Sequence, residues 1–189
     1  MGVTLKLVDF PLTDARILAL SRDNPGYRFE RMPTGELHVT PTGGEAGRRN
    51  SALIAQLHAW NSLLERGIVF DSSTGFVLPD GSLYAPDAAW LARDRWNALT
   101  PEQREQFLPL CPDAAFEIAS PSDRPDVLRT KMRLYIMNGA ALAVLIDPYA
   151  RSVELYRRGR DPEALQGTPR VTPGDPLSGF VLELGRILD

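Results

Sequence analysis

Two carboxylates and one lysine, carried by three consecutive predicted elements, are the residues of this chain best suited to chemistry. Asp87 lies in the run SLYAPDAAW, Glu117 in AAFEIASPS and Lys131 in RTKMRLY. Both acids stand inside apolar runs typical of strands, where a buried acid is costly unless it is paired or binds a metal ion. Lys131 follows the second strand in a helical pattern. Two acids and a lysine are the groups required for metal-assisted hydrolysis of a phosphodiester bond.

The expected chemistry follows from these charges. A magnesium ion between the two carboxylates would hold a water and a phosphate oxygen together, lower the pKa of the water and neutralise charge in the transition state. Lys131 would orient the water or stabilise the phosphate as a point charge. Leu128 and Tyr135 share a helix face with Lys131, so we expect that face to pack on the sheet and direct the lysine toward Glu117.

Each of the three residues also has a purely structural interpretation, and these alternatives stay open from the residues alone. Asp87 follows a proline and is compatible with a strand-end acid that accepts backbone hydrogen bonds. Glu117 lies between Phe116 and Ile118 and could face solvent by simple alternation. Lys131 could extend along the helix edge with its ammonium in water. Chance explains the three together, in this order, less readily than any one of them.

Composition restricts the kind of metal site. The chain has 189 residues, 43% of them hydrophobic, which is enough for one sizeable core. Cys111 is the single cysteine, which excludes an intrachain disulfide and a cysteine-based zinc site, and the only histidines are His38 and His58. A metal must therefore be held mainly by oxygen, which indicates Mg²⁺ or Mn²⁺.

Charge and hydropathy bear on partners and location. The sequence has no apolar run long enough to span a bilayer and no leader pattern, so we expect a soluble cytoplasmic protein. The net charge of −3 counts mildly against a nucleic-acid partner, although a nuclease can confine positive charge to one face. Lys6 and Lys131 are the only lysines, so a lysine in a semi-buried pattern stands out from a surface that otherwise uses arginine.

Hydrophobic periodicity and turn residues predict both helices and strands. Helices are expected over 12–23 after an N-cap at Thr13, over 46–66 up to a stop at Gly67, from a capping box at Thr100, and over 126–138. Strands are expected over 27–32, 36–40, 68–78, 82–92, 114–120, 141–147 and 152–157, with hairpins formed by the first pair and by the run 68–92. This order predicts an α+β fold, a mixed β-sheet flanked by helices, with a parallel strand–helix–strand unit over 114–147.

Several local motifs, spread over nearly the whole chain, are similar to one protein family. They are RFE at 28–30 with GEL at 35–37, GRRN at 47–50, FDSSTGF at 70–76, PDA at 86–88, RWNALTPE at 95–102, CPD at 111–113, EIASPSD at 117–123, KM at 131–132 with Tyr135 and NG at 138–139, and GF at 179–180. The chain thereby resembles the Uma-two family, assigned as restriction endonucleases within the PD-(D/E)XK nuclease superfamily. The resemblance implies a single restriction-endonuclease-like domain over 1–189, with a core of about 12–160 and a C-terminal extension over 161–189.

The resemblance also assigns roles to residues. Asp87 would be the first acid of the superfamily motif and Glu117 the second, and the backbone carbonyl of Ile118 would be a further metal ligand. The lysine that normally stands two residues after the second acid is absent, because that position is Ala119. Lys131, from the following helix, is its implied replacement.

Glu30 matches a further acid of the family. The resemblance implies that it extends the metal shell as a fourth catalytic residue. A structural salt bridge between Glu30 and an arginine is the alternative, and the sequence does not separate the two.

Two functional hypotheses follow. The first is an endonuclease, dependent on Mg²⁺ or Mn²⁺, that hydrolyses phosphodiester bonds in DNA. The alternative is a catalytically inactive nucleic-acid-binding or assembly module on the same fold, slightly favoured by the net acidity and by Ala119. A homodimer is also expected, because the helix around Trp60 and the apolar C-terminal segment need cover and a two-fold dimer can present one site to each strand of a duplex.

Overall fold

The computed structural model describes residues 2–7, 11–41 and 43–189. Its main sheet has the strand order β11–β10–β9–β8–β7–β4. These strands are β4 (Gly67–Asp71), β7 (Ala88–Ala92), β8 (Ala114–Ile118), β9 (Leu142–Asp147), β10 (Ser152–Arg157) and β11 (Glu163–Gln166). β8 and β9 pair in parallel and are connected by helix α5 (Pro125–Met137). The other neighbours in this sheet pair antiparallel. The mixed sheet and its parallel strand–helix–strand unit confirm the predicted α+β class.

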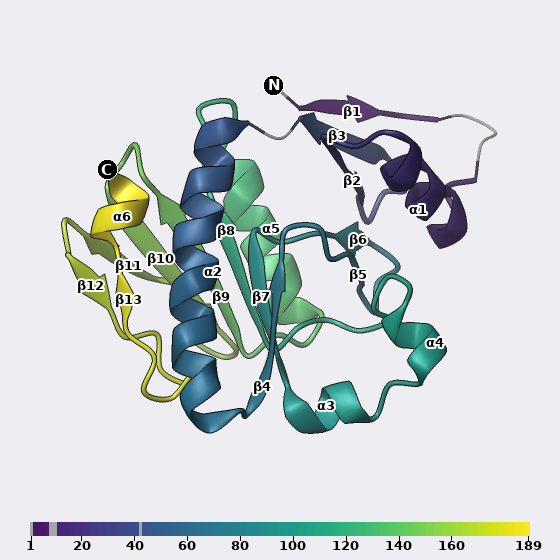
Figure 1. The fold of residues 1–189 in the computed structure, drawn as a ribbon. Helices are drawn as coiled ribbons and strands as arrows, with labels where there is room; N and C mark the ends of the chain where they lie inside the picture. Colours follow the sequence, from purple (N-terminus) through teal and green to yellow (C-terminus); the bar gives the residue numbers. More distant parts are fainter. Residues whose placement is uncertain (1, 8–10, 42) are drawn as a thin grey trace.

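Helices cover both faces of the main sheet (Figure 1). The long helix α2 (Gly44–Leu64) contributes Leu53 to a core cluster that includes Phe116 of β8, and α5 contributes Met132 to a second cluster that includes Ala115. Successive side chains of a strand point to opposite faces. Glu117 therefore points to the same face as Ala115, toward α5.

The N-terminal part forms a second sheet, ordered β1–β3–β2–β6–β5, which lies at one side of the main sheet together with α1 (Figure 1). Its strands are β1 (Val3–Leu5), β2 (Tyr27–Arg31), β3 (Leu37–Pro41), β5 (Phe76–Val77) and β6 (Leu83–Tyr84). Helix α1 (Asp14–Asp23) begins after Thr13, whose side chain accepts a hydrogen bond from the Arg16 amide as expected of an N-cap. Ile17 of α1 packs on Phe29 and Leu83 of this sheet.

The predicted hairpin over 68–92 is only partly right. β4 pairs with β7 in the main sheet, but β5 pairs with β6 in the N-terminal sheet, so the two halves of each predicted strand belong to different sheets. Turns interrupt both strands, after Asp71 on one side and at Pro86–Asp87 on the other. The Asp71 carboxylate accepts from the amide of Ser73 and fixes the first break. The second break places Asp87 between the two sheets.

The predicted stop of α2 at Gly67 is wrong. Glu65 takes the left-handed conformation, with φ 47°, and caps the helix, while Gly67 is already the first residue of β4. Gly67 is required for another reason: a Cβ there would lie 2.3 Å from the Trp90 ring. The glycine permits close approach between β4 and its neighbour.

The remaining elements are short helices and strands. They are α3 (Arg93–Asn97), α4 (Pro101–Arg104) with the predicted capping box at Thr100, and the C-terminal β12 (Arg170–Val171), β13 (Leu182–Glu183) and α6 (Gly185–Leu188). Phe180 belongs to the α2 core cluster and packs on Trp60, at 5.6 Å between ring centroids. The two segments that motivated a homodimer thus cover each other within one chain. Among the described residues, no helix has the length and apolar character needed to cross a membrane.

Candidate active site

Asp87 is buried at the point where the chain passes between the sheets. Its Oδ1 accepts hydrogen bonds from Arg28 Nη1 of β2 and Asn50 Nδ2 of α2, both at 3.1 Å. Its Oδ2 accepts from the backbone amide of Ile118 at 2.8 Å. Three segments far apart in sequence therefore hold one carboxylate that is 4% exposed. The bond from the Ile118 amide is the kind expected of a strand-end acid with a structural role. The bonds from Arg28 and Asn50 are additional contacts that this interpretation did not predict.

Glu117 lies on the α5 face of β8, as the alternation of the strand requires. It is 4% exposed, so the alternative in which it faces solvent is wrong. Its Oε1 lies 2.7 Å from Lys131 Nζ and accepts a hydrogen bond from the Tyr135 hydroxyl at 2.9 Å. Lys131 and Tyr135 are one helical turn apart on α5, which explains how one face of this helix supplies both partners.

Lys131 joins two acids instead of extending into solvent. Its side chain is 12% exposed, and its Nζ lies 2.8 Å from Glu30 Oε1 as well as 2.7 Å from Glu117. The ammonium also stands 5.0 Å from the centre of the Tyr84 ring. Glu30 Oε1 accepts a further hydrogen bond from the backbone amide of Ala85 at 3.0 Å. The ion-pair partner of Glu30 is thus a lysine, not the arginine considered from the sequence.

The structure brings the sequence-predicted residues into one cluster. Asp87 binds the amide of Ile118, the residue that follows Glu117, and Glu117 is paired with Lys131. Lys131 in turn connects this cluster to Glu30 on β2. We call the set of Asp87, Glu117, Lys131 and Glu30 the acid–lysine cluster.

Burial is the largest influence on the pKa values of Glu117, Glu30 and Lys131. It raises the pKa of Glu117 to about 7, with Asp87 adding to the rise and Lys131 opposing it. For Glu30 burial acts in the same direction, but Lys131 and Arg28 outweigh it and lower the pKa below its usual value. Burial would lower the pKa of Lys131, yet Glu117 and Glu30 raise it above its ordinary value. The ammonium therefore stays charged at neutral pH, while Glu117 titrates close to it.

The donor set of the cluster fits a magnesium or manganese ion. A carboxylate oxygen can accept about two hydrogen bonds. Asp87 Oδ1 and Glu117 Oε1 already have two partners each. Asp87 Oδ2 has only the Ile118 amide, and Glu117 Oε2 accepts from no described residue. Each acid therefore keeps one oxygen with a free lone pair. Within the described residues no group of three His, Cys, Asp or Glu side chains could hold a metal, but magnesium commonly uses only one or two carboxylates together with substrate phosphates.

The Ile118 carbonyl is compatible with its expected role. The pairing of Ala88 with Phe116, extended by two residues, sets Pro86 opposite Ile118. A residue in an extended strand directs its N–H and C=O to the same side, here toward Asp87. Because proline has no N–H, this carbonyl lacks a ladder donor on that side and is free to bind a cation.

Three residues of the site were not predicted as functional from the sequence. Arg28 and Asn50 were noted only as parts of family motifs, and Tyr135 only as part of a motif and as a neighbour of Lys131 on its helix face. Arg28 stands two residues before Glu30 on one strand, so period-two alternation could have placed it on the same face. Asn50 gave no comparable signal, because its contact with Asp87 depends on how α2 meets the sheet.

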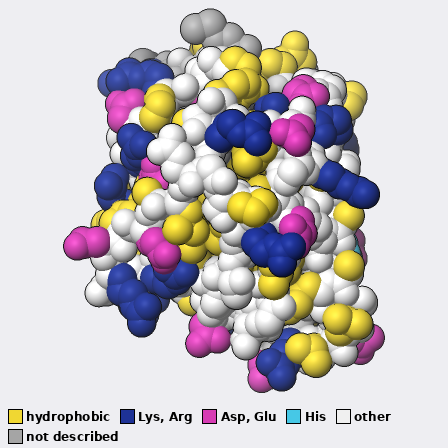
Figure 2. All heavy atoms as spheres, turned by 90° about the vertical axis from the view of Figure 1, so that its left-hand side faces the viewer, with side chains coloured by type: hydrophobic (Ala, Val, Ile, Leu, Met, Phe, Trp, Pro, Cys, Tyr) yellow, Lys and Arg dark blue, Asp and Glu magenta, His cyan; other side chains and the backbone are white. Residues whose placement is uncertain are grey.

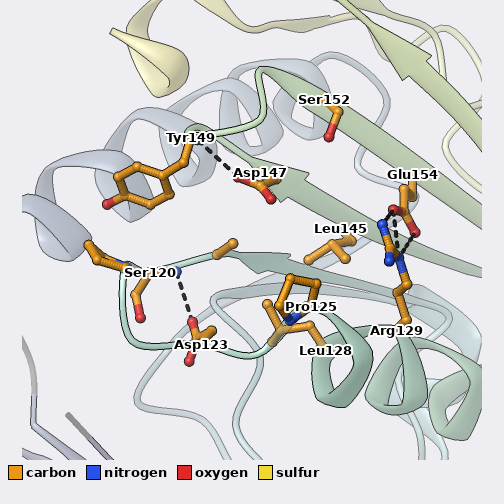
Figure 3. Close-up of a pocket in the computed structure, with 12 residues that line it drawn as sticks. Ser120, Asp123, Pro125, Leu128, Arg129, Leu145, Asp147, Tyr149, Ser152 and Glu154 are labelled. Carbon is orange, nitrogen blue, oxygen red and sulfur yellow. Dashed lines mark hydrogen bonds and ion pairs between the residues drawn. The ribbon is translucent and has the colours of Figure 1, made fainter.

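A pocket of about 200 Å³ lies between the start of α5 and the end of β9 (Figure 3). Tyr149, Asp147 and Ser152, from the β9–β10 connection, face the Ser120–Asp123 turn and the start of α5 across it. Leu145 forms part of its lining and is the register partner of Glu117. The pocket is therefore continuous with the strand positions that carry the candidate site.

Comparisons with known proteins identify the family and a similar fold. The family model Uma2, described as "Putative restriction endonuclease", matches residues 14–185. The fold is similar to the crystal structure of "a putative nuclease belonging to DUF820 from Anabaena variabilis ATCC 29413", with a TM-score of 0.71 and 16% sequence identity over 85% of this chain and 89% of that one. A search of curated proteins finds no match. The family match spans most of the chain, and the chain therefore belongs to the Uma2 family of restriction-endonuclease-like proteins.

Proposed function

We propose that this protein is a metal-dependent endonuclease that hydrolyses phosphodiester bonds in DNA. The observation that carries the proposal is the burial of Asp87 and Glu117 in one hydrogen-bonded cluster with Lys131, whose side chain is 12% exposed. Removing such charges from water is costly, and a buried ion pair often stabilises a protein no better than apolar residues of the same volume. A catalytic role therefore accounts for the presence of these buried charges better than a contribution to stability does.

Each residue has a distinct task in the proposed reaction. Asp87, Glu117 and the Ile118 carbonyl would hold Mg²⁺ or Mn²⁺, which would polarise the phosphate and lower the pKa of a water. Lys131 would orient the attacking water or stabilise the negative charge that develops on the phosphate. Glu30, through its contact with Lys131, would keep the ammonium in place, a different task from the metal ligation expected from the family pattern.

The test is a cleavage assay on linear and supercoiled DNA and on RNA, with Mg²⁺, Mn²⁺ or EDTA. We expect metal-dependent cleavage of DNA by the wild type, and none by Asp87→Asn, which keeps the shape but removes the charge. Arg129→Gln is the matched control. Arg129 forms an ion pair with Glu154 and its side chain is 48% exposed, so we expect this variant to cleave DNA as the wild type does. Cleavage in EDTA, or by Asp87→Asn, would rule out the proposed metal site.

The alternative, an inactive nucleic-acid-binding or assembly module, makes the opposite prediction. It was favoured by Ala119 at the position where the superfamily has its lysine. The 2.7 Å contact between Lys131 and Glu117 weakens that argument, because a lysine reaches the second acid by another route. Binding of DNA or RNA without cleavage under every metal condition would support the module.

The remaining expectations stay predictions. A homodimer would be detected by light scattering over a range of concentrations, and a monomer throughout would exclude it. The single domain over 1–189 predicts one cooperative unfolding transition. The cytoplasmic location requires cell fractionation.

A further inference from the structure

Arg28 has unused hydrogen-bond donors at the edge of the acid–lysine cluster. Its Nη1 donates to the Ala85 carbonyl at 2.8 Å and to Asp87 Oδ1 at 3.1 Å. No described residue accepts a hydrogen bond from its Nε or Nη2. The side chain is 19% exposed, compared with 6% for that of Asp87, so Arg28 is more accessible to solvent than the acid it contacts.

The unused edge has the shape that a phosphate requires. Nε and Nη2 point their N–H groups in the same direction, and this fork matches two oxygens of a phosphate group. Lys131 offers less, because two of its three donors already serve acids and the ammonium has no paired edge of donors for two phosphate oxygens. Of the two cations Lys131 and Arg28, Arg28 is therefore better able to bind a phosphate from solvent.

The pocket on the other side of β8 is unsuited to that task. Its lining includes the acids Asp123, Asp147 and Glu154, and its cation Arg129 already forms an ion pair with Glu154 at 2.7 Å (Figure 3). Repulsion between these carboxylates and a phosphodiester disfavours approach from the β9 side. Arg28 contacts Asp87 on the β7 side of the same strand, where a cation is available.

The face that carries α6 and the C-terminal strands gives no competing basic surface. Figure 2 shows its basic and acidic side chains interspersed, without a large area of one sign. Binding of a polyanion depends on clustered positive charge. This view gives no reason to place the substrate there.

We propose that Arg28 binds the non-bridging oxygens of a substrate phosphate through Nε and Nη2, beside the bond that is cut. The proposal rests on the proposed nuclease function and adds a substrate-binding residue to it. Arg28 would act in two ways: Nη1 orients Asp87, and the opposite edge holds the phosphate. The ligand class is a phosphodiester.

The first test uses the salt dependence of DNA binding. Fluorescence anisotropy of a labelled 20-base-pair duplex is measured in Ca²⁺ at several salt concentrations, with a gel to confirm that the duplex stays intact. Loss of one phosphate contact reduces the magnitude of the negative slope of log binding constant against log salt concentration by about 0.9. We expect this decrease for Arg28→Gln, which keeps an amide donor for Asp87 but loses the charge.

Arg31→Gln is the matched control. Arg31 lies on the same strand and has the same kinds of partner, two backbone carbonyls and one aspartate, Asp14. Its slope should equal that of the wild type. A wild-type slope for Arg28→Gln, or an equal decrease for Arg31→Gln, would overturn the proposal.

The second test does not depend on DNA binding and follows the wild-type protein. The Arg28 Nε–H resonance of the ¹⁵N-labelled wild type, assigned by its absence in Arg28→Lys, is followed during titration with diethyl phosphate. A saturable shift confined to Arg28 supports the contact, and no shift refutes it. A shift without nuclease activity would retain the phosphate site and reject the proposed function, whereas cleavage without a shift would do the reverse.

Asn50→Ala separates phosphate binding from the orientation of Asp87. Asn50 shares Asp87 Oδ1 with Arg28 but has no charge. We expect weaker Mn²⁺ binding by calorimetry and an unchanged salt slope for Asn50→Ala, and the opposite pattern for Arg28→Gln. If Arg28→Gln weakens only Mn²⁺ binding, Arg28 is a positioning residue for Asp87 and the phosphate assignment fails.

Discussion

Replacing Lys131 with methionine should strongly destabilise the protein. A lysine on an exposed helix face can be removed at little cost, because helix propensities differ by less than about 1 kcal/mol. Lys131 is instead enclosed between Glu30 and Glu117, whose side chains are 8% and 5% exposed. Methionine fills the same space but leaves both carboxylates without their main counter-charge. Breaking a buried pair in this way costs about 3–5 kcal/mol of unfolding free energy.

The cost should depend on pH. Without Lys131, the pKa of Glu117 rises further above its value in the unfolded chain, and the pKa of Glu30, which Lys131 helps to hold below its usual value, rises as well. A folded state that binds more protons than the unfolded state loses stability as pH rises. The loss in Lys131→Met should therefore be smallest near pH 5.5, where the acids can protonate, and largest near pH 8. For a chain of this length, about 3–5 kcal/mol corresponds to a decrease in Tm of roughly 6–20 °C.

The assay is urea unfolding of both proteins at pH 5.5 and pH 8 without metal. Arg129→Met, which breaks an exposed ion pair on the same helix, is the control and should cost only about 0.2–1 kcal/mol. The double variant Lys131→Met with Glu117→Gln should regain part of the loss, because it removes one uncompensated acid. A cost below about 1 kcal/mol at pH 8, or an equal cost at both pH values, would refute the buried double ion pair.

Three further predictions follow from the same contacts. Mn²⁺ affinity measured by calorimetry should rise between pH 6 and pH 8, because Glu117 has a pKa of about 7 and must release its proton to bind the ion; an affinity independent of pH would contradict this. Lys131→Arg should lose nearly all DNA cleavage, because a planar guanidinium cannot replace a compact ammonium between two acids, and full activity would show that Lys131 has no catalytic role. Gly67→Ala should lower the unfolding free energy by about 1–3 kcal/mol, because its Cβ would lie 2.3 Å from the Trp90 ring, whereas Gly47→Ala, inside α2 with open space around it, should not.

The sequence predicted local structure better than the pairing of sheets. Alternation over 68–92 correctly indicated strands joined by a turn. It could not show that Phe70 pairs with Ala89 in one sheet while Phe76 pairs with Tyr84 in another, because alternation is the same in both. The end of α2 was missed for a related reason. A glycine near the end of a helix suggests a cap, but Gly67 is required because the Trp90 ring leaves no room for a Cβ, and this tertiary contact is not visible in the sequence.

In the candidate site, too, the sequence indicated the features that depend on local structure and missed those that depend on long-range contacts. Glu117 could be oriented from its position in a strand and Lys131 from its position on a helix face, because each argument is local. The bonds that hold Asp87 connect it to Asn50 and Arg28, 37 and 59 residues away. No periodicity reports such distances. Residue types suggested the acids and the lysine, but only the fold reveals their neighbours.

The position of Lys131 on α5 connects the N-terminal sheet to the candidate site. A lysine at position 119 would rise from β8 on the same face as Glu117, since side chains two apart on a strand point the same way. Lys131 reaches Glu117 from α5 instead and needs a second anchor, which Glu30 supplies from β2. Glu30 is in turn tied to the Ala85 amide, beside the crossing that positions Asp87. A module that needed only the fold could replace these buried charges with apolar residues at no loss of stability. Their presence on three separate elements favours the enzyme over the inactive module.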